Sequence, residues 1–369
     1  MSRLDRDLET KLTDFALALV DQQKARVAVP PQRSSTGFWF GGGNMVEDAE
    51  GRFYLVGRYR NFGDSRTGLG AGERGLELAI FRSDDRGQSF QKQVSFSKPE
   101  LNVGDRSVLS IEGSALHFNE QGVELFVSTE KAGIEYPAEF QSFLKPGAGV
   151  WTIERLQADS IDELKNASIE TVLESIEPAV LHVKDPVVYS TASGDLVLMY
   201  CTHSYCWSSS NTAYAMRASG SDELSESCFS FFPRGFAWDI AIARGTCILD
   251  VPQVGVFANR QVSLLFYDGG EALRNLDEHE QAVKRPRGYS CEEIGGVAYF
   301  IGGDMSRIYR LSRNKPLFIS PYGTGCSRYV DVLAANDGLY ATWQQSQVDL
   351  SQPLVLNFVS NDEVAKLLA

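Results

Sequence analysis

Three acidic residues stand at the start of similar segments of the sequence. Glu112, Asp185 and Asp250 each precede an apolar stretch that leads into a turn and a second apolar stretch. Carboxylates held within roughly 5–10 Å of one another can cleave a glycosidic bond, one as general acid and the other as nucleophile or base. We predict that Glu112 is the acid, that Asp250 is the base or nucleophile, and that Asp185 orients substrate and tunes Glu112. The alternative is that each carboxylate forms a structural ion pair with a nearby Arg or Lys.

The segments that carry these residues belong to a hairpin pattern that recurs five times. Turn signals such as Glu50-Gly51 and Asp337-Gly338 separate the two apolar runs of each copy. Propeller blades typically recur every ~40–50 residues, and this pattern recurs at a slightly longer interval. The sequence therefore predicts an all-β fold, a five-bladed β-propeller with long loops. The five copies begin at Asn44, Glu112, Asp185, Asp250 and Arg328.

Two helices are expected beside the hairpins. Apolar residues at helical spacing, among them Leu8, Leu12 and Phe15, predict an N-terminal helix over about residues 4–26. We divide the chain into this helix, residues 1–30, and the propeller, residues 31–369. The helix is expected to pack on the propeller, or alternatively to form a homodimer contact. A second helix is predicted from Ser160 to Leu173, because Ser160 and Glu163 fit a capping box.

The hairpin topology predicts where a site lies. Each blade runs outward from its innermost strand, so the start of the first strand and the end of the second meet at one end of the barrel. Burying unpaired charges costs several kcal/mol, so a core has no reason to place polar residues there. We predict that the polar residues at these positions bind substrate: Asn44, Arg58, Arg60, Lys184, His203, Tyr267, Asp268 and Arg328.

Composition narrows the classes of partner. The chain has 48 acidic and 35 basic residues and a net charge of −13, which argues against nucleic acid or an anionic membrane as a partner. The N-terminus lacks the apolar stretch of a secretory signal, and no run approaches the ~20 apolar residues of a membrane span, so we expect a cytoplasmic protein. The six cysteines and four histidines show no metal-binding spacing. We therefore expect free thiols, no metal and no cofactor.

Two short motifs resemble known families. The segments Ile111-Glu112-Gly113 and Lys184-Asp185-Pro186 resemble the Glu-Gly and Asp-Pro elements of the five-bladed glycosidases, namely the arabinanase/β-xylosidase and β-fructosidase groups. The resemblance implies a glycoside hydrolase that acts on a terminal sugar or small oligosaccharide in the axial pocket. It implies Glu112 as the acid and Asp185 as a residue that tunes the acid or binds sugar hydroxyls. Those families place a base Asp in the first blade, where this chain has Gly43-Asn44, and they place the Glu after the Asp-Pro.

A third motif resembles the sialidase-like propellers. Ser83 to Phe90 matches the Asp-box S-x-D-x-G-x-[ST]-[WF], a turn between the two outer strands of a blade. Sialidases clamp a substrate carboxylate with three arginines and use a Tyr polarised by Glu as nucleophile, which gives an alternative function on an acidic sugar. Further alternatives are a polysaccharide lyase, with Tyr or His as the base, and a non-catalytic sugar-binding propeller. The sialidase-like candidates are Arg58, Arg60 and Arg328, with Tyr289 near Glu292 and Glu293, or Tyr329.

Overall fold

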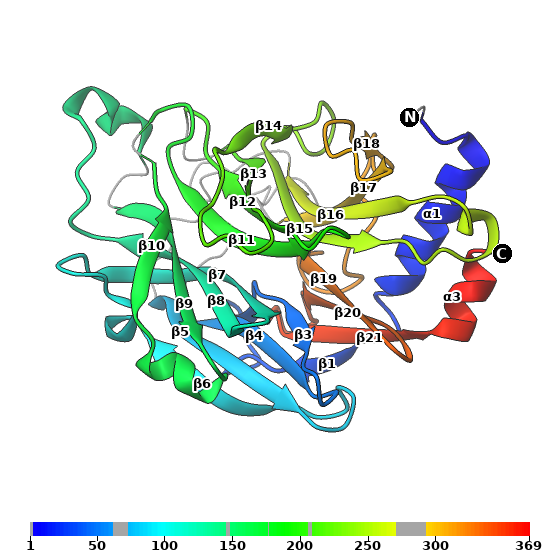
Figure 1. The fold of residues 1–369 in the computed structure, drawn as a ribbon, viewed down its shortest axis with the longest axis horizontal. Helices are drawn as coiled ribbons and strands as arrows, with labels where there is room; N and C mark the ends of the chain where they lie inside the picture. The colour runs from blue at the N-terminus through cyan, green and yellow to red at the C-terminus, as the bar shows by residue number, and fades with distance from the viewer. Residues whose placement is uncertain (1–2, 62–72, 145–147, 176, 206–208, 271–292) are drawn as a thin grey trace.

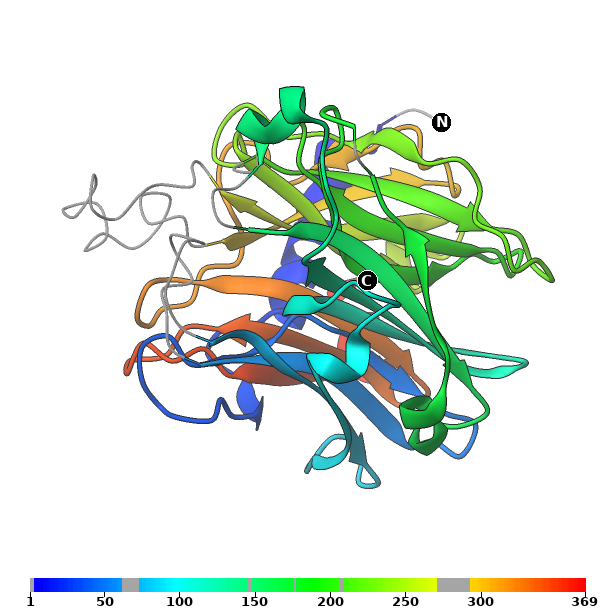
Figure 2. The same ribbon diagram turned by 90° about the vertical axis from the view of Figure 1, so that its left-hand side faces the viewer.

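A computed structural model describes residues 3–61, 73–144, 148–175, 177–205, 209–270 and 293–369. Its strands form five blades of antiparallel strands around one axis, and a parallel bridge from Ile294 to Ser327 joins blades 4 and 5 into one eight-stranded sheet (Figures 1 and 2). The predicted all-β, five-bladed propeller with an N-terminal helix is therefore confirmed. Blade 1 contains β2 (Trp39–Gly41), β3 (Met45–Glu47), β4 (Phe53–Asn61), β5 (Glu73–Ser83) and β6 (Gln91–Ser97). Blade 2 contains β7 (Val108–Asn119), β8 (Gly122–Lys131), β9 (Val150–Ala158) and β10 (Ile169–Leu173).

The remaining blades complete the circle. Blade 3 contains β11 (Val183–Ser190), β12 (Leu196–Thr202), β13 (Asn211–Arg217) and β14 (Cys228–Phe232). Blade 4 contains β15 (Ile242–Asp250), β16 (Val262–Gly270), β17 (Ile294–Ile301) and β18 (Tyr309–Arg310). Blade 5 contains β19 (Ser327–Ala335), β20 (Gly338–Gln345), β21 (Leu354–Ser360) and β1 (Arg26–Val29). The inner strands β3, β7, β11, β15 and β19 contact one another in that order, and β19 contacts β3 again.

The first strand of the chain closes the ring. β1 pairs antiparallel with β21, so the N-terminal segment supplies the outermost strand of the last blade. Residues 26–29 thus belong to the propeller, and the boundary that we predicted between residues 30 and 31 falls too late. No local sequence pattern indicates this pairing, because β1 has only four residues and its partner lies more than 300 residues away.

The N-terminal helix α1 (Arg6–Leu19) packs on the propeller. Asp5 caps it by accepting a hydrogen bond from the Leu8 amide at 2.9 Å. Leu12 and Phe15 are fully buried in one apolar cluster with residues of blades 4 and 5. The C-terminal helix α3 (Asn361–Leu367) lies beside α1, so the two ends of the chain meet on one side of the molecule (Figure 1). The homodimer contact through α1 stays a prediction.

The prediction of a second helix from Ser160 to Leu173 is wrong. Residues 162–166 form one short 3-10 helix, η3 (Asp162–Asn166), and residues 169–173 form β10, which pairs with β9. Ile169, Thr171 and Val172 are β-branched, which favours a strand over a helix. Three more 3-10 helices connect strands in the described ranges, η1 (Pro99–Leu101), η2 (Ala138–Phe143) and η4 (Gly255–Phe257). None of the described helices is both long enough and apolar enough to span a bilayer.

The segment from Ser83 to Phe90 forms the turn between β5 and β6, the two outer strands of blade 1. Asp85 accepts hydrogen bonds from the amide and the hydroxyl of Ser89 at 2.9 and 2.6 Å, and these bonds lower the Asp85 pKa to about 2. Arg86 and Gly87 have φ angles of 57° and 76°. The carboxylate therefore organises a tight turn far from the axis.

Candidate functional site

The inner strands share one irregularity. The pairing of β7 shifts between Ile111 and Ser114, and that of β11 shifts between Lys184 and Val187. β15 and β19 shift in the same way, and in blade 1 a break separates β2 from β3. Such bulges redirect side chains and often lie next to active sites. They bring five groups to one level of the axis: Gly42–Asn44, Glu112-Gly113, Asp185-Pro186, Thr246 and Tyr329-Val330.

The bulges of blades 2 and 3 contact each other directly. The Gly113 amide donates a hydrogen bond to Asp185 Oδ1 at 3.0 Å. Ser128 Oγ accepts a hydrogen bond from the Asp185 amide at 3.0 Å and donates one to the Gly113 carbonyl at 3.2 Å. A Cβ atom at residue 113 would lie 2.7 Å from the Asp185 Cα, so only glycine permits this approach. Asp185 itself has a φ of 55°. Glu112 and Asp185, two of the predicted catalytic residues, are thereby brought together.

Glu112 is held but remains accessible. Ser110 Oγ donates to Glu112 Oε1 at 2.8 Å, and Arg58 Nη2 lies 3.4 Å from Oε2. The Glu112 side chain keeps 15% of its surface exposed. Arg58 also donates to the Gly41 carbonyl at 3.2 Å and to the Tyr329 hydroxyl at 3.1 Å. The Glu112 carboxyl is therefore partly exposed to solvent while Arg58 and Ser110 hold it in place.

Asp185 is held as a carboxylate. Burial acts to raise its pKa, but the positive charges of Lys184, Arg58 and Arg244 outweigh burial and lower the pKa below its ordinary value. Lys184 Nζ lies 3.9 Å from Asp185 Oδ2. A group that stays ionised cannot donate a proton near neutral pH, so Asp185 does not suit the role of a general acid.

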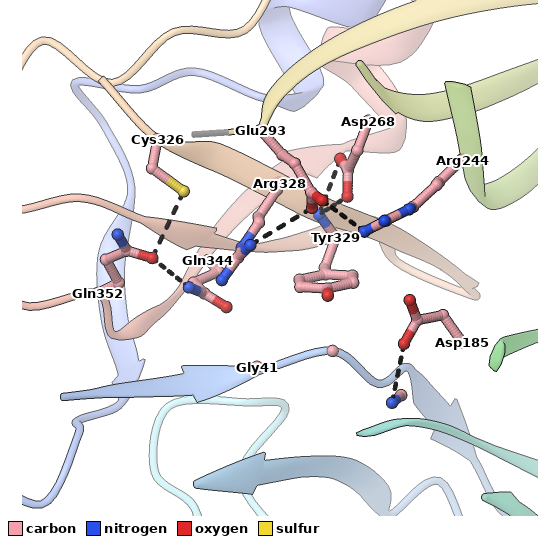
Figure 3. Close-up of polar contacts among 12 residues, drawn as sticks. Gly41, Asp185, Arg244, Asp268, Glu293, Cys326, Arg328, Tyr329, Gln344 and Gln352 are labelled. Carbon is pink, nitrogen blue, oxygen red and sulfur yellow. Dashed lines mark hydrogen bonds and ion pairs between the residues drawn. The ribbon is translucent and has the colours of Figure 1, made fainter. Parts of the chain in front are cut away.

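A second charged group lies across the axis (Figure 3). Arg244 and Arg328 approach Glu293 from opposite sides, and Arg328 Nη1 lies 3.3 Å from Glu293 Oε2. Both oxygens of Asp268 accept from the Tyr329 amide at 3.0 Å. Burial and the negative charge of Glu293 raise the Asp268 pKa well above its ordinary value, whereas the two arginines outweigh burial and lower the Glu293 pKa. The same environment therefore favours the neutral form of Asp268 and the ionised form of Glu293.

The structure does not bring Asp250 to this cluster. Asp250 ends β15 and accepts hydrogen bonds from Ser263 Oγ at 2.5 Å and Tyr189 OH at 3.1 Å. It lies five residues beyond Gly245, which at about 3.3 Å per residue is roughly 16 Å along the strand. The prediction that grouped Asp250 with Glu112 is wrong because residues 251–261 connect β15 to β16 and are not an inner strand. Pro252 was the signal, since proline is rare in central strands.

The predicted binding residues divide into three sets. Arg58, Lys184, Asp268 and Arg328 lie in the charged cluster described above. Asn44 instead joins two blades, exchanging hydrogen bonds with the Leu116 backbone at 2.8 and 2.9 Å. The remaining three are buried. Arg60 lies two residues beyond Arg58 on β4, and the centre of the His203 ring lies 5.7 Å from that of His182. Tyr267 stacks on Trp238, and its hydroxyl lies 3.2 Å from Asp239.

Two residues of the cluster, Arg244 and Tyr329, are not among the predicted binding residues. Arg244 was missed because the fourth repeat was read as starting at Asp250, although Arg244 directly precedes the β15 bulge. Tyr329 was named only as an alternative, and it lines the axial cavity with Asp185 and Arg244. Of the other sialidase-like candidates, Tyr289 and Glu292 lie outside the described residues.

Cys201, Cys228, Cys247 and Cys326 are free thiols, whereas Cys206 and Cys291 lie outside the described ranges.

The axial cavity beneath the cluster is narrow. Its volume is about 20 Å³, which accommodates roughly one water molecule. This cavity is therefore too small to hold a sugar ring. In the ranges that the structure describes, no three His, Cys, Asp or Glu side chains are grouped so that they could bind one metal ion.

The opposite end of the axis opens into a cavity of about 490 Å³ that Asp331 helps to line. Asp331 Oδ2 accepts a hydrogen bond from the Met45 amide at 2.8 Å, and burial raises the Asp331 pKa to about 7. The folded chain thus binds this proton more tightly than the unfolded chain, in which the pKa is about 3.9. The contribution to stability is complete below about pH 3.9 and is lost as the pH rises through about 7.

Replacing Asp331 with Asn should therefore stabilise the protein in a pH-dependent manner. The amide cannot ionise, and its oxygen still accepts from Met45. We expect the free energy of unfolding of Asp331→Asn to exceed that of the wild type by an amount that grows between about pH 4 and 7 and then levels off. Urea unfolding at several pH values measures this difference. A difference that does not change with pH would contradict the proposed burial of the carboxyl.

Comparison with known proteins supports the fold. No protein-family model matches the sequence. No match is found among curated proteins either. Among solved structures, the chain is similar to an α-L-arabinofuranosidase from Lactobacillus brevis, with 9% identity over 92% of this chain and 95% of that one and a TM-score of 0.56. A thermostable family-43 glycoside hydrolase is 10% identical over 90% and 92% of the two chains, with a TM-score of 0.55. A further glycoside hydrolase is 9% identical over 96% of both chains, with a TM-score of 0.63. The predicted resemblance to the propeller glycosidases is confirmed at the level of the fold.

Proposed function

We propose that this chain is a glycoside hydrolase that acts on a terminal sugar or a short oligosaccharide at the Glu112 end of the propeller axis. One observation carries the proposal: bulges on neighbouring inner strands place an accessible Glu112 next to an ionised Asp185. Two carboxyl groups in different environments are what acid and base roles in glycoside hydrolysis require. The fold shared with an arabinofuranosidase adds support from an independent direction.

In this proposal each carboxyl has a defined task. Glu112 donates its proton to the oxygen of the leaving group, and Arg58 and Ser110 hold the carboxyl in place. Asp185 takes the role that the sequence had suggested for Asp250: its negative charge faces the developing positive charge of the sugar ring, as nucleophile or as base toward water. Lys184 keeps Asp185 ionised.

A panel of aryl glycosides tests the proposed function. We expect release of the aryl alcohol from at least one neutral sugar, arabinofuranosides and xylosides being the first to assay because of the fold. Hydrolysis forms no new double bond, so the ultraviolet absorbance that an unsaturated uronate product gives should not increase. A lyase would increase it. Binding of oligosaccharides by calorimetry without any turnover would instead indicate a non-catalytic sugar-binding propeller.

A second candidate, hydrolysis of an acidic sugar, is favoured by one specific observation. Arg244 and Arg328 carry two positive charges, and Arg58 and Lys184 add two more, whereas Asp185 and Glu293 are the carboxyls whose pKa is lowered and the pKa of Asp268 is raised well above its ordinary value. Arg58 and Arg328 also lie over the Tyr329 ring, at 5.2 and 5.0 Å. This excess of positive charge suits a sugar carboxylate.

Tyr329 is nevertheless a poor nucleophile. Burial and the negative charge of Asp185 raise the Tyr329 pKa above its ordinary value, which disfavours the phenolate. An acidic sugar would thus be cleaved by the same two carboxyls. We expect Tyr329→Phe to keep more than about a tenth of the wild-type turnover, whereas loss of a nucleophile costs several orders of magnitude. Measuring the turnover of sialosides, uronides and neutral glycosides by this variant and by the wild type decides between the two substrate classes.

A further inference from the structure

Ser190, His117 and Glu124 are aligned on the face of the propeller opposite Glu112. Ser190 Oγ lies 3.3 Å from His117 Nε2, and His117 Nδ1 lies 3.0 Å from Glu124 Oε2. His117 and Glu124 are cross-strand partners on β7 and β8, whereas Ser190 comes from the end of β11 in the next blade. A nucleophile within reach of a base that a third group orients is the arrangement of hydrolytic triads.

The chemistry of Glu124 fixes the tautomer of His117. Burial acts to raise the Glu124 pKa, but hydrogen bonds from Arg217 and His117 outweigh burial and lower it to about 2. An ionised carboxylate can only accept hydrogen bonds, so His117 Nδ1 must carry the proton in this contact. In the neutral imidazole, Nε2 is then an acceptor that faces the Ser190 hydroxyl. Glu124 is thus a positioning residue for the base.

The scaffold around this row is rigid. Arg217 binds both oxygens of Glu124 at 2.6 Å, and Asn119 Nδ2 donates to Oε2 at 3.0 Å. The Glu124 side chain is buried, and that of His117 is 17% exposed. Because two blades supply the parts and an ion pair joins them, the three groups keep their relative positions.

Ser190 and His117 are also accessible from two cavities. Both residues line the cavity of about 490 Å³ that also contains Asp331, and both line another cavity of about 320 Å³ between blades 2 and 3. The Ser190 residue is exposed. It follows Asp185 by five residues on β11, which is roughly 16 Å along the strand, so this row is separate from the carboxyl pair. A small acyl group can approach the Ser190 hydroxyl from either cavity.

From this geometry we propose that Ser190, His117 and Glu124 form a second hydrolytic site, which cleaves small carboxylic esters. Ser190 Oγ attacks the ester carbonyl, its proton moves to His117 Nε2, and the carbonyl electron pair moves onto oxygen. When the carbonyl reforms, the bond to the alcohol breaks and the alcohol leaves with the proton from Nε2. Water then attacks the acyl-serine in the same way, which releases the carboxylic acid and restores Ser190.

A fluorophosphonate probe tests the site on the intact protein. We expect the probe to label Ser190, as peptide mass spectrometry would show, and Ser190→Ala to remove that label. His117→Gln should slow labelling by about 100-fold or more, because it removes the base, while the amide can still donate to Glu124. Ser193→Ala is the matched control: Ser193 is an exposed serine of the same turn, bonded to Asp195, and its loss should change nothing.

Hydrolysis of a small ester separates a hydrolytic role from a structural one. Hydrolysis of p-nitrophenyl acetate should follow the same pattern and should be unaffected by Glu112→Gln. Labelling of Ser190 no faster than Ser193, or at the wild-type rate in His117→Gln, would overturn the proposal.

Discussion

Replacing Glu112 with Gln should reduce turnover of the cleaved glycoside by about 10²–10⁴-fold, the range expected when a general acid is lost. The amide retains the shape of the carboxyl and can still bond Ser110, but it cannot protonate a leaving group. The loss should depend on the substrate. A dinitrophenyl glycoside has a leaving group that needs no proton and should be affected far less than an alkyl glycoside. Steady-state kinetics on the two substrates measures this dependence.

Asp250→Asn is the matched control for this experiment. Asp250 lies roughly 16 Å along β15 from the level of the carboxyl pair and is bonded to Ser263 and Tyr189. We expect its turnover to stay within about twofold of the wild type. Full activity of Glu112→Gln on both substrates would refute the assignment of the acid, and a loss in Asp250→Asn alone would restore the interpretation based on the sequence.

The second large effect is expected for Glu293→Gln, and it concerns stability. Glu293 is the carboxylate that Arg244 and Arg328 share, and all three side chains are buried. Removing one partner of a buried ion pair costs about 3–5 kcal/mol, because a buried charge is left without compensation. We expect the free energy of unfolding to fall by about that amount. Urea unfolding monitored by tryptophan fluorescence would measure the fall.

The pH dependence gives this prediction a specific signature. Once Glu293 is neutral, the arginines favour ionisation of Asp268, whose pKa is raised in the wild type partly by Glu293. Ionised Asp268 can then replace part of the missing charge, so the loss of stability should shrink as the pH rises. Glu170→Gln is the control, since Glu170 is 55% exposed in its pair with Arg155 and should change stability by no more than about 1 kcal/mol. Equal effects of the two substitutions would contradict the buried cluster.

The sequence alone predicted most of the architecture. Alternating apolar runs around turn residues revealed the hairpins, because side chains of a strand alternate between its two faces whatever the rest of the fold. It also placed Glu112 and Asp185 at the same end of the axis, because each directly precedes the apolar run of its inner strand and such a run is easy to locate in the sequence. It failed for Asp250, where a connection containing Pro252 resembled a strand.

The tertiary structure alone decided which residues meet. Arg244 and Glu293 lie 49 residues apart in the sequence, and Ser190 and His117 lie 73 apart, so no local pattern could pair them. Protonation was likewise beyond the sequence, because Asp185 and Asp268 are the same residue type and differ only in burial and in the charges beside them. The sequence determined the strands and the chemical groups they carry. The closure of the five blades determined the level of each bulge, and with it which carboxyl has a raised pKa and which a lowered one.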